Sequence, residues 1–93
     1  MTLQHDDGHT RVARWDFPPG TETGEHVHEF DYVVVPVTDG ELTIELPDGS
    51  SVPSPIASGT SYARHAGVAH NVVNLGEAHV AFVEIELLDR PIA

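Results

Sequence analysis

The chain contains no cysteine, no lysine and no hydrophobic run long enough to span a membrane. Without cysteine no disulfide can stabilise the fold, and this absence fits a reducing compartment. The first residues, MTLQHDDGHT, lack the apolar segment of a signal peptide. We therefore expect a cytoplasmic protein that does not interact with membranes.

Basic residues are few. The chain has fifteen acidic residues and four arginines, which gives a formal net charge of -11. A field of this sign repels phosphate backbones, so a nucleic-acid partner is not expected. The acidic side chains are interpreted as a solvated surface that keeps the protein soluble.

The length of 93 residues allows one domain with a small core. A metal ion or a second subunit would add stability to such a core. Residues 1–10 are polar and are expected to form a flexible N-terminal segment, so the folded domain is expected to cover residues 11–93.

No window has a helical period, and short apolar runs alternate with turns rich in Gly, Pro and Asp. This pattern predicts seven or eight strands in a sandwich or barrel. In Arg11–Phe17, Trp15 and Phe17 share the face expected to be buried. Further strands are expected at 26–37, 41–46, 51–58, 61–64, 70–74 and 80–88.

Two of these strands carry specific expectations. Residues 33–37 and 41–46 are predicted to pair as a hairpin around Asp39-Gly40, with Leu42, Ile44 and Leu46 pointing inward. In the last strand, one face carries Glu84 and Glu86, and the other carries three aliphatic residues. We expect the glutamates outside and the aliphatic residues inside, namely Val83, Ile85 and Leu87.

Seven histidines are present, and two of them stand two residues apart. Side chains alternate along a strand, so His26 and His28 are expected on one face together with Phe30 and Tyr32. Two imidazoles on one face make half of a metal site. His70, in a later strand, is expected to supply the other half.

The spacing of these residues carries a resemblance to a known family. Gly20, five residues and then His26-Val27-His28 form a first motif. In the second motif, Gly59 is followed after five residues by His65-Ala66-Gly67. His70 follows after two more residues, and Asn74 after a further three. In this order and at these spacings the chain resembles the cupins, with His65 where the family usually has proline.

The resemblance implies an all-β double-stranded β-helix, or jelly-roll, barrel that often forms a homodimer. It also implies that His26, His28 and His70 bind a divalent transition metal, either iron, zinc, nickel, copper or manganese. The glutamate that usually completes the family's first motif is missing, because Tyr32 and Val33 occupy its place.

Several groups compete for the fourth metal position. Tyr32 lies on the same face as the histidines. It is expected to be a phenolate ligand, a hydrogen-bond donor to substrate or a core tyrosine. Asp31 and Glu29 have the opposite parity unless a bulge reorients them. Glu84 is an outside candidate, and water is the remaining one.

Other residues of the motifs have simpler interpretations. His65 is expected to cap the turn at Ala66-Gly67, and Asn74 to make structural hydrogen bonds. Arg64 is expected to form a plain salt bridge rather than to bind a substrate carboxylate.

Three neutral imidazoles would leave a divalent metal with its full charge, which favours an anionic ligand. Three-histidine cupins include dioxygenases that act on thiols and diketones. The resemblance therefore implies a dioxygenase- or isomerase-type enzyme for a small anionic metabolite bound in the barrel. A non-enzymatic ligand-binding or sensing cupin and a metal-free structural dimer are the alternatives, since Tyr32 is the single evident proton-transfer group.

Overall fold

The structure is a computed structural model and describes residues 1–91. Within this range the chain forms nine β-strands and no helix, and so no helix that could cross a membrane. The strands are β1 (Thr2–Asp6), β2 (Thr10–Phe17), β3 (His26–Val27), β4 (Phe30–Pro36), β5 (Gly40–Glu45), β6 (Ser51–Ile56), β7 (Tyr62–Arg64), β8 (Ala69–Val73) and β9 (Val80–Pro91).

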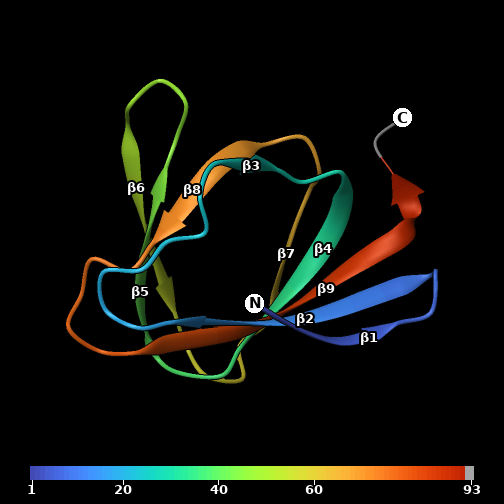
Figure 1. Cartoon of the computed structure of the whole chain (residues 1–93), viewed down its shortest axis with the longest axis horizontal. Helices are drawn as coiled ribbons and strands as arrows, with labels where there is room; N and C mark the ends of the chain where they lie inside the picture. The colour runs from blue at the N-terminus through green and yellow to red at the C-terminus, as the bar shows by residue number, and fades with distance from the viewer. Residues whose placement is uncertain (92–93) are drawn as a thin grey trace.

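Two antiparallel sheets face each other across a central space (Figure 1). The larger sheet has the order β1-β2-β9-β4-β7, and the smaller has the order β3-β8-β5-β6. Their facing sides form the hydrophobic core, which consists of Phe17, Tyr32, Val34, Leu42, Ile56, Val72, Val80 and Phe82. The predicted fold class, an all-β jelly roll, is therefore confirmed.

The strand β1 was not expected from the sequence. Its five residues are all exposed, and it pairs with β2 alone at the edge of the larger sheet. The turn into β2 is fixed by Asp7, whose carboxylate accepts the backbone N–H groups of His9 and Thr10 at 2.8 Å each. Backbone pairing at an open sheet edge thus orders a polar segment that has no apolar pattern of its own.

The predicted hairpin of residues 33–46 is wrong. β4 pairs with β7 and β9, whereas β5 pairs with β6 and β8. The chain crosses from one sheet to the other at residues 37–39, where the N–H of Val37 donates to the carbonyl of Ala81 at 2.9 Å. Gly40 follows with φ of 154°, and a Cβ placed there would lie 2.9 Å from Val80. The positive φ and the close approach of Val80, rather than a tight hairpin turn, account for glycine at this position. Leu42, Ile44 and Leu46 nevertheless point inward as predicted, since all three line the central cavity.

The assignment of faces in β9 is also wrong. Val80, Phe82 and Glu84 are buried on the inner face, while Val83, Ile85 and Leu87 lie on the outer face and are half-buried. Both faces of this strand are apolar along part of their length, so alternation alone does not determine which one faces the core. The pairing Trp15↔Phe82 and Ala13↔Glu84 with β2 fixes the parity.

Candidate metal centre

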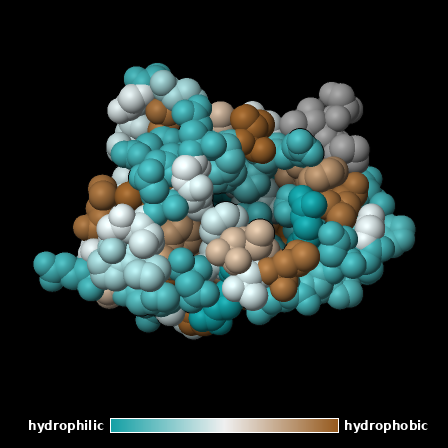
Figure 2. Space-filling view, in the orientation of Figure 1, coloured by the Kyte–Doolittle hydropathy of each residue, from teal (hydrophilic) through white to brown (hydrophobic). Residues whose placement is uncertain are grey.

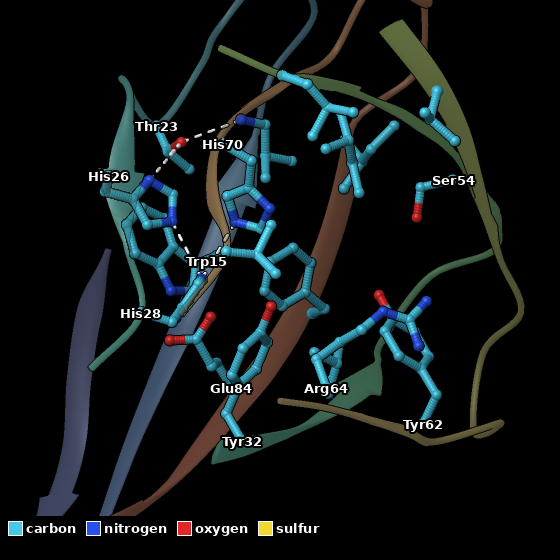
Figure 3. Close-up of a pocket in the computed structure, with 18 of the residues that line it drawn as sticks. Trp15, Thr23, His26, His28, Tyr32, Ser54, Tyr62, Arg64, His70 and Glu84 are labelled. Atoms are coloured by element: carbon cyan, nitrogen blue, oxygen red, sulfur yellow. Dashed lines mark hydrogen bonds between the residues drawn. The ribbon is translucent and has the colours of Figure 1, made fainter. Parts of the chain in front are cut away.

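The side chains of His26, His28 and His70 meet at one end of the central space (Figure 3). His26 and His70 are direct cross-strand partners in β3 and β8. His28 lies in the short connection to β4, where the chain crosses to the larger sheet. The predicted continuous strand from His26 to Val37 is therefore interrupted at this point, but the break brings the second imidazole back toward the first.

The imidazole nitrogens are spaced as metal ligands would be. The Nε2 atoms of His26 and His28 are 3.1 Å apart, and those of His28 and His70 are also 3.1 Å apart. One ligand atom of each of the three histidines lies within 4.8 Å of the others. Tetrahedral ligands about 2.0 to 2.1 Å from a zinc-like ion stand about 3.3 Å apart. The donor set could therefore hold a divalent transition metal with small adjustments.

The orientation of His26 is fixed by its other ring nitrogen. Its Nδ1–H donates to the carbonyl of Gly24 at 2.9 Å, which leaves the lone pair on Nε2. Gly24 is held in turn, because its N–H donates to the side-chain oxygen of Asn71 at 3.0 Å. Partners of this kind set the tautomer of ligating histidines in metalloproteins.

The other two histidines are buried and favour the neutral form. Burial, with the neighbouring imidazoles, lowers the pKa of His28 from 6.5 to about 4. Burial also lowers the pKa of His70, and His26 adds to this effect. Neutral imidazoles at neutral pH are the form that binds metal.

The turn at residues 65–67 supports His28 and accounts for Asp31. The N–H of Gly67 donates to the carbonyl of His28 at 2.9 Å, and the N–H of Ala66 donates to the carboxylate of Asp31 at 2.9 Å. Asp31 caps this turn and is not part of the histidine group. The prediction that His65 caps the turn is wrong, because its side chain is 97% exposed. The carboxylate that caps the turn lies 35 residues earlier in the chain, so the sequence of the turn itself does not reveal it.

Tyr32 lies against the histidines as expected. Its ring stacks on His28 with centroids 4.0 Å apart, and its side chain is buried. Burial raises its pKa to about 12, so the hydroxyl keeps its proton at neutral pH. In the described part of the chain no hydrogen bond is made by this hydroxyl, which leaves it available to a ligand.

Glu84 is the main residue that the sequence analysis misplaced. It is 8% exposed and extends toward His28 and Tyr32 (Figure 3). Burial, with repulsion from Glu86, raises its pKa from 4.5 to about 7, although Arg11 opposes the rise. It lies outside the group of close ligand atoms. The cavity thus contains a carboxyl group that can lose or gain a proton near neutral pH, beside the histidines but separate from them.

Two other motif residues can be placed. Asn74 is completely buried, and its amide donates to the carbonyls of Phe17 and Ala78 at 2.8 Å each, so its predicted structural role is confirmed. Arg64 lies over the ring of Tyr62 at 4.4 Å and has no salt bridge within residues 1–91, contrary to expectation. Its side chain lines the rim of the cavity instead.

The cavity has a volume of about 700 Å³ and opens to solvent between the sheets. Figure 2 shows the molecule hollowed near the middle of one face. A smaller pocket of about 290 Å³ reaches His26 and His28 between Arg11, Glu29 and Glu86. Small-molecule sites have this size and shape, with a few polar groups converging in a largely apolar hollow.

The chain forms a jelly-roll barrel with an internal group of three histidines. Its residues 13–86 match the family described as "Cupin domain". The chain belongs to this family. A curated relative, "Beta-alanine degradation protein BauB" of Pseudomonas aeruginosa, is 49% identical over 86 residues, which cover 92% of this chain and 90% of that protein.

Solved structures give the same result. A cupin domain from Bordetella pertussis is 51% identical, with a TM-score of 0.87 over 92% of this chain and 88% of that one. The polyketide cyclase RemF of Streptomyces resistomycificus shares the fold, with a TM-score of 0.67 and 19% identity over 90% of this chain and 58% of that one. At this identity the second likeness concerns the fold alone.

Proposed function

We propose that this cupin binds one divalent transition-metal ion through His26, His28 and His70, and that the loaded protein is an enzyme acting on a small molecule in the cavity. The observation that carries the proposal is the set of three imidazoles spaced as ligands, with the buried Glu84 beside them. A three-histidine site without a carboxylate ligand has open positions for a substrate.

A divalent metal held at this site would supply Lewis-acid chemistry to an oxygen atom of the bound molecule. The protein's own groups supply proton transfer. Glu84 can accept a proton near neutral pH, and the hydroxyl of Tyr32 can donate a hydrogen bond. The sequence alone offered Tyr32 as the single proton-transfer group, so the inward position of Glu84 strengthens the case for an enzyme.

The proposed substrate is a small β-amino acid or a compound formed when one is degraded. The support is the 49% identity with the Pseudomonas protein named for beta-alanine degradation, over most of both chains. The reaction is proposed to be of the oxygenase or isomerase type, because three-histidine cupins include dioxygenases and because the cavity contains a carboxyl group able to move a proton.

Metal content of the untagged protein tests the proposal. We expect about one iron, zinc, nickel, copper or manganese ion per chain in elemental analysis, and less than about a tenth of this in the His70→Ala variant. The matched control is His65→Ala, which removes an exposed histidine and should keep its metal. A wild-type protein that stays metal-free after reconstitution at neutral pH would reject the proposal.

We further propose a cytoplasmic homodimer, formed through the outer face of the larger sheet. Paired rows of half-buried aliphatic side chains cross this face, among them Val12, Ile85 and Val33. Apolar surface of this kind is stabilised when a second subunit covers it. Cell fractionation tests the proposed location.

Val33→Glu is expected to convert the dimer to a monomer. The substitution would place a charge in the interface without touching the cavity, because Val33 points outward between Tyr32 and Val34, and we expect the dimer to weaken by about 100-fold or more. Size-exclusion chromatography with light scattering measures the change. Thr60→Glu, in an exposed turn, is the control. A dimer that survives Val33→Glu would show that the subunits meet elsewhere.

A further inference from the structure

The polar groups beside the histidines lack partners. Among the described side chains no hydrogen bond to the carboxylate of Glu84 is found, and Glu84 lines the cavity. The indole N–H of Trp15 is buried with no acceptor. Arg11 does not neutralise Glu84, because its guanidinium donates to both carboxylate oxygens of Glu86 at 2.8 and 3.1 Å. A ligand of matching chemistry in the cavity would give the carboxylate of Glu84 and the hydroxyl of Tyr32 the partners that they lack within the protein.

These groups define the head of that ligand. Glu84 accepts hydrogen bonds and attracts positive charge, whereas the hydroxyl of Tyr32 donates. Both side chains extend toward the histidines from the larger sheet (Figure 3). A molecule that carries both an ammonium group and a carboxylate satisfies both kinds of protein group at once. The net charge of -11 also attracts the ammonium end.

The opposite wall of the cavity has a different chemistry. It is formed mainly by aliphatic residues of β5, of β6 and of the segments that follow β5 and precede β8, namely Leu42, Ile44, Leu46, Val52, Pro53 and Val68. The volume of about 700 Å³ is in the range that holds drug-sized ligands and far exceeds a three-carbon amino acid. A small polar molecule would leave this apolar wall exposed to water.

We propose that the cavity binds a β-amino acid with an apolar substituent. The ammonium group pairs with Glu84, the carboxylate accepts a hydrogen bond from Tyr32, and the substituent lies against β5 and β6. This inference rests on the proposed function, in which the cavity takes a β-amino acid, and it goes further by assigning the apolar substituent and the group that binds each end of the ligand. It makes unsubstituted β-alanine a poor ligand, because β-alanine leaves the aliphatic wall uncovered.

Trp15 provides the measurement, since it is the single tryptophan of the chain and lines the cavity. Its fluorescence in the metal-loaded protein is titrated with β-phenylalanine, with β-alanine, and with hydrocinnamate, which has the phenyl group but no amine. We expect β-phenylalanine to bind about tenfold or more tightly than either other probe. Equal affinity for β-phenylalanine and hydrocinnamate, or no saturable change with β-phenylalanine, overturns the proposal.

Variants separate the two ends of the ligand. Glu84→Gln should weaken the binding of β-phenylalanine about tenfold and leave hydrocinnamate unaffected, whereas Glu41→Gln, an exposed glutamate of β5, should change neither. Val52→Thr on the aliphatic wall should weaken β-phenylalanine severalfold and leave β-alanine unaffected. Unchanged β-phenylalanine binding in Glu84→Gln overturns the proposal.

Metal content is measured in the same samples. A wild-type protein that holds one metal ion per chain but does not distinguish the three probes would refute this inference and leave the proposed metal site intact. Loss of metal from the wild-type protein itself would instead refute the proposed function.

Discussion

Saturation with Ni²⁺ or Zn²⁺ is expected to raise the melting temperature of the protein by about 15 to 30 °C. The ion binds the folded state, in which the three imidazoles already lie together, and a concentration about 1,000 times the dissociation constant adds about 4 kcal/mol. For a domain of this size each kcal/mol shifts the melting temperature by about 4 to 8 °C. Thermal unfolding followed by circular dichroism, with and without a chelator, measures the effect.

The control for this prediction compares metal-induced shifts, because removal of a buried histidine also changes the metal-free stability. His70→Ala should abolish most of the shift, and His65→Ala should retain it. An equal shift in both variants would mean that the ion acts at another place on the acidic surface.

Glu84→Gln is expected to stabilise the metal-free protein at alkaline pH by roughly 3 kcal/mol, or about 10 to 20 °C in melting temperature. The carboxyl group titrates at about 7 in the folded state against an ordinary value of 4.5. Below about pH 4.5 the carboxyl group is protonated in both the folded and the unfolded state, so it does not change the free energy of unfolding. Between 4.5 and 7 the unfolded chain ionises first, so the folded state loses stability as pH rises, and the loss is complete above 7.

The pH dependence is the decisive part of this experiment. The groups that face Glu84 are Arg11 on β2, Glu86 on its own strand, and Tyr32 and the nearby His28. Unfolding in denaturant at pH 4 and pH 8 should give a gain for Glu84→Gln at pH 8 alone, and Glu41→Gln should give none at either pH. A gain of equal size at both values would assign the effect to packing rather than to ionisation.

The histidine group was predictable because its signal is local. The spacing of His26 and His28, and the position of His70 in a second motif, predicted that the three side chains lie together, as they do in the structure. Tyr32 was also placed correctly, since it lies four residues after His28 and returns to the same side after the break between β3 and β4.

The errors concern contacts between distant segments. Glu84 was assigned to the surface because β9 has aliphatic residues on both faces, and the pairing with β2 is what determines its parity. Asp31 was considered as a ligand, but its partner is an N–H group 35 residues away. The hairpin prediction failed for a similar reason, because turn residues at Asp39-Gly40 do not reveal whether the chain turns back within one sheet or crosses to the other.

The β5–β6 hairpin projects from the smaller sheet beyond the histidine strands (Figure 1). The three candidate ligands come from β3, β8 and the connection to β4, whereas the hairpin contributes the aliphatic wall. The three histidines of the proposed metal site and the residues of the aliphatic wall therefore lie in separate stretches of the chain. Changes in the length or sequence of this hairpin would alter the wall without touching the histidines.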